Sequence, residues 1–209
     1  MSRISVAVCL PLYGQVPSVF FRRFLEFLSF SGQKYNVEVL SVDFTAVDVA
    51  RNIVVERFLK ESKSDYALFL DSDMVFPANL LDLLFASNKE IVSGLFYSRK
   101  KIKPAFRMLT DGKHIIPEKF SENELVKVDA VGLSCMLLKR SVLEKLDSLH
   151  SRKPLFINEY SSRKDFLGED FYFCKLLREA GFEIFLDPKI LIGHMGGIIP
   201  EEKFKDYVY

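Results

Sequence analysis

Two aspartates, in the run Asp71-Ser72-Asp73, directly follow the apolar segment 66–70. Two carboxylates two residues apart at the end of a buried strand can converge on one hard cation. Such a cation prefers oxygen ligands and accepts phosphate oxygens in its remaining positions. The same aspartates could instead form a solvated turn or cap the next helix. That helix is expected to begin near Pro77, so neither aspartate directly precedes it. The turn therefore favours a metal or nucleotide site.

Glu169 and Asp170 form a second candidate site, at the start of an expected helix over 168–180. Acidic residues in the first turn of a helix complement its dipole, which is worth ~0.3–1 kcal/mol for each and needs no catalytic role. The alternative is that one of them takes a proton from a reacting hydroxyl, which requires an approach to within ~2.6–3.2 Å. Both interpretations stay open on these residues alone.

His194 lies among glycines in the run 193–197. A single histidine of this kind often serves as a hydrogen-bonded turn residue, whereas flanking glycines also let the backbone come close to a ligand. An imidazole nitrogen beside the Asp73 carboxylate would give one nitrogen and one oxygen ligand, with room left for phosphate oxygens and water. His194 is therefore a candidate metal ligand.

Short apolar runs alternate with amphipathic segments in the first half of the chain. Strands are expected over 4–10, 37–42, 66–70 and 91–97, and helices over 19–30, 47–59 and 77–86. This alternation is typical of a doubly wound α/β fold. Such sheets bind ligands beyond the carboxyl ends of their strands, which is where Pro11, Asp43 and Asp71 fall.

The second half of the chain is less regular. The segment 98–126 is polar and 150–167 is expected to be a loop; strands are expected over 126–131 and 133–138, helices over 141–149 and 168–180, and short strands over 182–186 and 190–192. Gly132 would mark a bend between two of these strands. It is compatible either with a β-bulge or with close approach of a bound sugar to the backbone.

Composition excludes several classes of protein. The 209 residues are 49% hydrophobic and 27% charged, which is ordinary for a globular chain. The net charge of +1 gives no general attraction to nucleic acid, so no such partner is expected. No apolar run approaches the ~20 residues of a membrane helix. Cys9, Cys135 and Cys174 are too far apart for a disulfide framework or a zinc motif, and buried free thiols are expected.

Taken in order, the motifs resemble those of a known family. The run 66–73, the Glu169-Asp170 pair and His194 are similar in order and spacing to those of GT-A-fold glycosyltransferases, especially the family-2-like group. The resemblance covers about residues 4–197 and implies one GT-A-type α/β domain over 1–209. A nucleotide-binding half over 1–97 would hold the mostly parallel central sheet. Residues 98–209 would form a less regular acceptor-binding half and the C-terminal tail.

The resemblance also implies a metal-dependent glycosyltransferase. Mn²⁺ or Mg²⁺ would be held by Asp73 and His194, with help from Asp71, against the diphosphate of a UDP- or GDP-sugar. Asp170, with Glu169 beside it, would act as the catalytic base of an inverting transfer to an acceptor hydroxyl. A retaining transferase on the same fold and a non-catalytic nucleotide- or sugar-binding module are the alternatives.

The loops after the first two strands are implied to contact the nucleotide. In the family the first loop lies along the base, which singles out Pro11 and Tyr13, although both residues also suit a plain turn. Asp43 would face the base. The residues around it lack the Asp-Asp-Gly-Ser type of run common in the group, which leaves the identity of the base open.

Three further residues complete the expected donor-binding set. Arg51 could meet a base, a phosphate or Asp71, or it could form an ion pair on its own helix with Asp48. Ser72 lies between the two aspartates of the acidic turn. Gly132 could let the donor sugar or the acceptor approach the backbone.

The expected partners follow from the same resemblance: a nucleotide-sugar donor and a saccharide, lipid-linked or small-molecule acceptor. The chain has no Trp and no Gln-x-x-Arg-Trp run, which argues against a processive synthase. With no secretion signal in the sequence, a cytoplasmic location is expected. The aromatic tail with Phe204, Tyr207 and Tyr209 leaves open a peripheral contact with the inner face of the membrane, or a homodimer contact.

Overall fold

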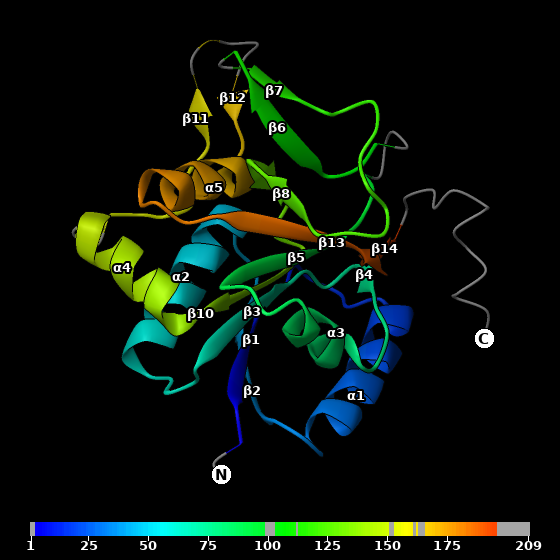
Figure 1. Cartoon of the computed structure of the whole chain (residues 1–209). Helices are drawn as coiled ribbons and strands as arrows, with labels where there is room; N and C mark the ends of the chain where they lie inside the picture. Colours follow the sequence, from blue (N-terminus) through cyan, green and yellow to red (C-terminus); the bar gives the residue numbers. More distant parts are fainter. Residues whose placement is uncertain are drawn as a thin grey trace.

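The computed structural model of the chain describes residues 3–98, 103–111, 113–150, 153–160, 162 and 166–195. Within them, a central sheet of seven strands has the order β2-β1-β3-β10-β5-β13-β8 (Figure 1). The strands of this sheet are β2 (Asn36–Val42), β1 (Ser5–Pro11), β3 (Tyr66–Leu70), β10 (Cys135–Lys139), β5 (Ile91–Leu95), β13 (Ile184–Leu191) and β8 (Val126–Val128).

Most strands of the central sheet run in one direction. β1 is parallel to β2 and β3, and β13 is parallel to β5. β10 lies antiparallel between β3 and β5, and β8 is antiparallel to β13 at the edge. The central strands are nearly continuous buried apolar runs, as expected for a sheet covered on both faces. The predicted α/β fold with a mostly parallel central sheet is confirmed.

Helices cover both faces of the sheet. They are α1 (Ser18–Ser31), α2 (Val47–Lys60), α3 (Leu80–Ala86), α4 (Arg140–His150) and α5 (Glu169–Glu179). α1 and α3 pack on one face, where Phe20 and Phe27 are buried. α2, α4 and α5 pack on the other, where Phe58 and Phe173 are buried. Figure 1 shows α1 and α3 on one side of the strands and α4 and α5 on the other.

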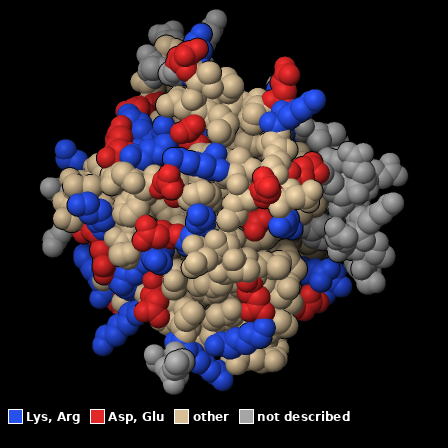
Figure 2. Space-filling model, in the orientation of Figure 1, with Lys and Arg blue, Asp and Glu red and all other residues tan. Residues whose placement is uncertain are grey.

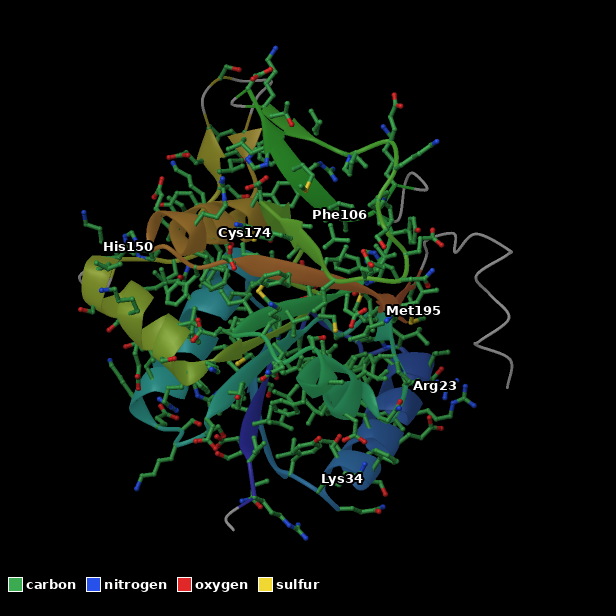
Figure 3. All side chains as sticks on the ribbon, in the orientation of Figure 1. Arg23, Lys34, Phe106, His150, Cys174 and Met195 are labelled. Carbon is green, nitrogen blue, oxygen red and sulfur yellow. The ribbon has the colours of Figure 1, made fainter. Side chains whose placement is uncertain are left out.

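The described residues also form three small sheets. β6 (Phe106–Thr110) pairs with β7 (Lys113–Ile115) and β9 (Ala130–Val131), β11 (Glu159–Tyr160) with β12 (Phe166–Leu167), and β4 (Met74–Val75) with β14 (Gly193–His194). In Figure 1, β6, β7, β11 and β12 stand above α5. The β4–β14 ladder brings the end of the described chain back to the acidic turn after β3. Met195, labelled in Figure 3, marks this place.

The second half contains more strand than its sequence predicts. β6 and β7 fall in the polar segment 98–126, and β11 and β12 fall in the expected loop 150–167. The expected strand 126–131 is divided at Asp129 between β8 and β9, which belong to different sheets. These strands are short, and β7 and β11 are largely exposed, so their local pattern is too weak to predict them.

β13 is one strand where the sequence predicts two short ones. Pro188 interrupts the pattern because it cannot donate a ladder hydrogen bond. In the structure Pro188 falls in an irregular part of the β13–β5 ladder, between Asp187 and Leu191, where the register shifts. α3 also differs from expectation, since it begins at Leu80 and not at Pro77.

The predicted state of the cysteines is confirmed, because Cys9, Cys135 and Cys174 are free and buried. Figure 3 labels Cys174, which lies inside the molecule on α5. Burial raises the pKa of Cys135 and Cys174 to about 12, so both stay protonated thiols.

On the face drawn in Figure 2, Lys and Arg side chains are interspersed with Asp and Glu. Among the described residues, no helix is long and apolar enough to cross a membrane. The aromatic tail with Phe204, Tyr207 and Tyr209 lies outside the described residues.

Candidate functional site

A cleft of about 580 Å³ opens beyond the carboxyl ends of β1 and β3. Its walls come from the turns after these strands, the first turns of α2 and α5, and β14. This is the edge at which an α/β sheet is expected to bind ligands. The predicted site residues that line the cleft are Pro11, Tyr13, Arg51, Asp71, Ser72, Asp73, Glu169, Asp170 and His194.

Asp73 and His194 meet across the short β4–β14 ladder. The ladder pairs His194 with Met74, and the Met195 N–H donates to the Asp73 carbonyl over 2.8 Å. This register sets Nε2 of His194 3.3 Å from Oδ2 of Asp73. The two atoms are close enough for one cation to contact both, as a nitrogen–oxygen ligand pair.

The contact made by the second ring nitrogen indicates the tautomer of His194. Nδ1 lies 3.1 Å from the carbonyl oxygen of Tyr97, which can only accept, so Nδ1 is assigned the proton. Nε2 then carries the lone pair that a metal would use, the usual arrangement of a ligating histidine. The Phe96 ring packs edge-on against the imidazole, with 6.0 Å between centroids, and restrains it further.

As candidate ligands, Asp73 and His194 would leave positions open on a bound cation. Among the described residues, no group of three or more His, Cys, Asp or Glu side chains could hold a metal. A structural metal site is usually closed by about four protein ligands, which is more than Asp73 and His194 would supply. Asp73 and His194 would contribute two ligands, and substrate oxygens or water would have to supply the others.

Arg51 connects two acidic turns at the cleft. It is only 3% exposed. Its Nη2 donates to both carboxylate oxygens of Asp71, over 3.0 and 3.1 Å, and its Nη1 donates to Oε1 of Glu169 over 2.7 Å. Asp71 is one of the partners that the sequence leaves open for Arg51, whereas Glu169 is not foreseen. Burial lowers the pKa of Arg51, but the surrounding carboxylates outweigh it and raise the pKa above its ordinary value.

Asp170 lies half-buried in the first turn of α5. Its Oδ1 accepts the N–H of Phe171 over 2.7 Å. Burial raises the pKa of Asp170 to about 6, the charge of Glu169 adds to this, and Arg51 opposes it. At neutral pH the carboxylate is ionised yet far more basic than that of an ordinary aspartate, which is the property required of a general base.

Gly132 lies behind Asp170 and does not line the cleft. A Cβ at this position would stand 2.6 Å from Cζ of Phe96 and 3.4 Å from Oδ2 of Asp170. The backbone at Gly132 is thus packed directly against the Phe96 ring, which leaves no room for a side chain. Because Phe96 also contacts His194, this glycine links the packing around Asp170 to the packing around His194.

The two nucleotide loops differ in how they meet the cleft. Pro11 and Tyr13 line it, and Tyr13 is 80% exposed. Asp43 follows β2, is exposed, and is not part of the lining, so the structure does not bring it together with the other candidates. The next residue, Phe44, is 80% exposed and has a φ of 54°. A positive φ is rare for a residue with a bulky side chain.

Ser134 is a site residue that the sequence did not single out. It lines the cleft, and its Oγ donates to Oδ2 of Asp71 over 2.6 Å. It lies there because β10 runs antiparallel beside β3 and pairs Cys135 with Leu70. A serine directly before an apolar strand is too common a signal to identify such a residue without this pairing.

Comparisons with known proteins support the fold. No family model and no curated protein matches the chain. The structure is similar to A197 from STIV, with a TM-score of 0.56 and 20% identity, over 88% of this chain and 81% of that one. It is also similar to GalNAc-T7 solved with UDP, GalNAc and Mn²⁺, with a TM-score of 0.55 and 12% identity.

The matches differ in TM-score and in the share of each chain that they cover. The match covers 97% of this chain but 46% of the GalNAc-T7 chain, so this chain spans about half of that protein. A glycosyltransferase involved in the glycosylation of the major capsid of PBCV-1 matches with a TM-score of 0.46 and 14% identity, over 93% of this chain and 94% of that one. The two structures with the higher TM-scores carry the conclusion: this chain has a GT-A-like α/β fold.

Proposed function

We propose that the chain is a metal-dependent glycosyltransferase, which moves a sugar from a nucleotide-diphosphate sugar to an acceptor hydroxyl. The observation that carries the proposal is the presence of a ligand pair, Asp73 and His194, and a basic carboxylate, Asp170, in one cleft of about 580 Å³. The similarity to GalNAc-T7, solved with UDP and Mn²⁺, supports the same use of the cleft.

The donor would bind at the acidic turn. Asp73 and His194 would hold Mn²⁺ or Mg²⁺, and Asp71 would assist from its place beside Arg51 and Ser134. When bound, the cation would supply Lewis-acid stabilisation of the diphosphate leaving group. The buried Arg51 cation pairs with Asp71 and orients it in the turn that would face this group.

The nucleotide would lie along the loops after β1 and β3. Pro11, Tyr13 and Ser72 line the cleft there and would contact the nucleoside of a UDP- or GDP-sugar. Asp43, which is exposed at the end of β2, would reach the base only from outside the cleft lining. Gly132 would influence donor or acceptor binding through the ring of Phe96 that it accommodates.

Asp170 would act as the base of an inverting transfer. Its carboxylate would take the proton of the acceptor hydroxyl as the acceptor oxygen bonds to the anomeric carbon. The bond from that carbon to the diphosphate oxygen breaks at the same time, and the electron pair leaves with the diphosphate. Glu169, the other acidic residue of this turn, is paired with Arg51. The acceptor would be a saccharide, a lipid-linked sugar or a small molecule, modified by single transfers.

Calorimetric titration tests the donor site. UDP, GDP, dTDP and CMP are each titrated with and without Mn²⁺, and one nucleoside diphosphate should bind only when the metal is present. Asp73→Asn and His194→Gln should each remove this metal-dependent binding. Asp111→Asn, in the exposed β6–β7 turn, and His150→Gln, at the end of α4, are matched controls that should bind normally. Absence of binding by every nucleotide would contradict the proposal.

The product decides between the mechanistic alternatives. Once a donor is identified, NMR of the transferred sugar gives its anomeric configuration. Inversion is the outcome expected if Asp170 is the base, and Asp170→Asn should then abolish transfer while nucleotide binding persists. Retention would assign the chain to a retaining transferase. Metal-dependent binding without any transfer would indicate a nucleotide- or sugar-binding module.

A further inference from the structure

Glu169 and Asp170 are adjacent acidic residues on one helical turn, yet they have different partners. Glu169 accepts from Nη1 of Arg51 over 2.7 Å. Asp170 accepts the N–H of Phe171 and, among the residues that the structure describes, forms no ion pair within 4 Å. Both line the same cleft, so their location alone does not show which of them would act as the catalytic base.

Arg51 pairs with Glu169 and not with Asp170 in this turn. Its Nη2 is occupied by the two oxygens of Asp71, which leaves Nη1 directed to Glu169. A guanidinium is planar, so two such contacts fix its orientation. Asp71 follows β3 and Glu169 begins α5, and the single buried cation therefore ties the donor-side turn to the helix that carries Asp170.

We infer that Arg51 is a positioning residue that assigns the role of base to Asp170 rather than to Glu169. The inference rests on the proposed function, because it concerns the base of that reaction. By pairing with Glu169, Arg51 withholds this carboxylate from proton transfer and fixes the first turn of α5. Asp170 is left as the carboxylate of the pair that can receive a proton.

The inference predicts opposite shifts in the pKa of Asp170 for two substitutions, because the charges of Glu169 and Arg51 act on it with opposite signs. The titratable and charged groups that face Asp170 are Glu169 and Cys174 on α5, Arg51 on α2, Asp71 after β3 and Arg107 on β6. After burial, Glu169 raises the pKa of Asp170 most, and Arg51 lowers it. Removal of Arg51 should therefore raise this pKa further, and neutralisation of Glu169 should lower it. A general loosening of the fold would not move the two variants in opposite directions.

Carbon-13 NMR of the carboxyl groups measures these titrations directly in the full chain. The Asp170 resonance is assigned by its absence from the spectrum of Asp170→Asn. Arg51→Met should raise its titration midpoint by about one unit, the order expected when an opposite charge is removed, and Glu169→Gln should lower it. Arg51→Lys keeps the charge but not the planar fork, so it should leave the midpoint near the wild-type value.

The experiment includes a control variant and a second test variant in case Arg51→Met does not fold. Lys60→Met removes a cation from the same helix, where Lys60 pairs with Glu56 on the surface, and should leave the Asp170 midpoint unchanged. Arg51→Met leaves two carboxylates without their cation and could prevent folding. Glu169→Gln preserves the pair of Arg51 with Asp71, so it tests the inference even then. Unchanged midpoints in every folded variant of Arg51 and Glu169 would overturn the inference.

The transfer reaction supplies a second readout. The pH midpoint of kcat should move with the NMR midpoint, upward in Arg51→Met and downward in Glu169→Gln. Arg51→Lys should keep the pH midpoint but lose kcat, because the orientation of the helix turn is no longer fixed. Shifted NMR titrations without any nucleotide binding would support the pairing and overturn the proposed function. Unshifted titrations together with metal-dependent nucleotide binding would overturn the inference alone.

Discussion

Nε2 of His194 lies 3.3 Å from Oδ2 of Asp73, while Nδ1 of the same ring lies 3.1 Å from the carbonyl oxygen of Tyr97. The carbonyl accepts the Nδ1 proton, so a neutral imidazole presents its lone pair toward a carboxylate. Two electron-rich atoms this close are stabilised by a cation between them. The backbone ladder that sets this distance would therefore pre-form the metal site that we propose.

Metal and nucleoside diphosphate should bind synergistically. The proposed site has two ligands, Asp73 and His194, and the described residues contain no larger cluster, so Mn²⁺ alone should bind weakly. Phosphate oxygens would fill further positions and raise the affinity for Mn²⁺ by at least about tenfold. Electron paramagnetic resonance of free Mn²⁺ measures this with and without the nucleoside diphosphate. The unphosphorylated nucleoside is the control, and an equal effect of both ligands would refute a metal shared with diphosphate.

Asp170→Asn should stabilise the protein at neutral pH. The pKa of Asp170 is raised by burial to about 6 in the folded state, above its value of ~3.9 in the unfolded chain. Between these values the folded state binds the extra proton, so stability falls as pH rises through this range. Asparagine has no charge to bury. Above pH 7 the free energy of unfolding of the variant should therefore exceed that of wild type by up to about 3 kcal/mol.

The pH dependence of this gain distinguishes it from ordinary repacking. Below about pH 3 the carboxyl group is largely protonated in both states, so wild type and Asp170→Asn should have nearly equal free energies of unfolding. Urea denaturation at about pH 3 and pH 7.5 gives both values. Asp111→Asn should show no such difference between the two conditions. A gain that is independent of pH would show that Asp170 is not held in an unfavourable charged state.

The positions of the aspartates and of the main strands could be predicted from local pattern. Buried parallel strands read as short apolar runs, and Asp71 and Asp73 follow such a run at the carboxyl edge of the sheet. The helix that begins at Glu169 is also marked locally, by acidic residues in its first turn. Chain order and local chemistry were enough for these features because each depends on neighbours within a few residues.

The links between the site residues could not be predicted in this way. Arg51 meets Glu169 because α2 and α5 pack on the same face of the sheet, and no pattern near Arg51 encodes that. His194 reaches Asp73 through a ladder of only two residues on each side, which is too short to show a strand period. β10 enters antiparallel between β3 and β5, and this choice depends on the whole sheet.

Gly132→Ala should disturb the packing around both Asp170 and His194. The added Cβ would stand 2.6 Å from Cζ of Phe96, so the ring must move, and it is in contact with His194. Overpacking of this kind costs about 1–3 kcal/mol of stability, and metal-dependent nucleotide binding should weaken as the imidazole shifts. Phe96→Leu provides space for the methyl group. The double variant should therefore lose less stability than the sum of the single variants, as measured by urea denaturation. Strict additivity would contradict a contact between the two positions.

Ser134→Ala should affect the nucleotide more than the fold. The Ser134 hydroxyl donates to Oδ2 of Asp71 over 2.6 Å, and its removal leaves Arg51 as the remaining side-chain donor to that carboxylate among the described residues. The loss of one hydrogen bond to a charged group costs about 1.5–3 kcal/mol at most, and part of it should appear as weaker metal-dependent binding because Asp71 lines the cleft. Calorimetry and urea denaturation measure the two effects separately.

Ser87→Ala is the matched control for this prediction. The Ser87 hydroxyl also donates to an aspartate, Oδ2 of Asp187, over 3.2 Å, and Ser87 is 9% exposed, close to the 7% of Ser134. Its bond lies away from the cleft lining, so its removal should reduce stability without changing nucleotide affinity. If both serine variants lower stability alone and leave nucleotide binding intact, Ser134 only supports the fold. If only Ser134→Ala weakens binding, the hydroxyl holds Asp71 in the orientation that the donor requires.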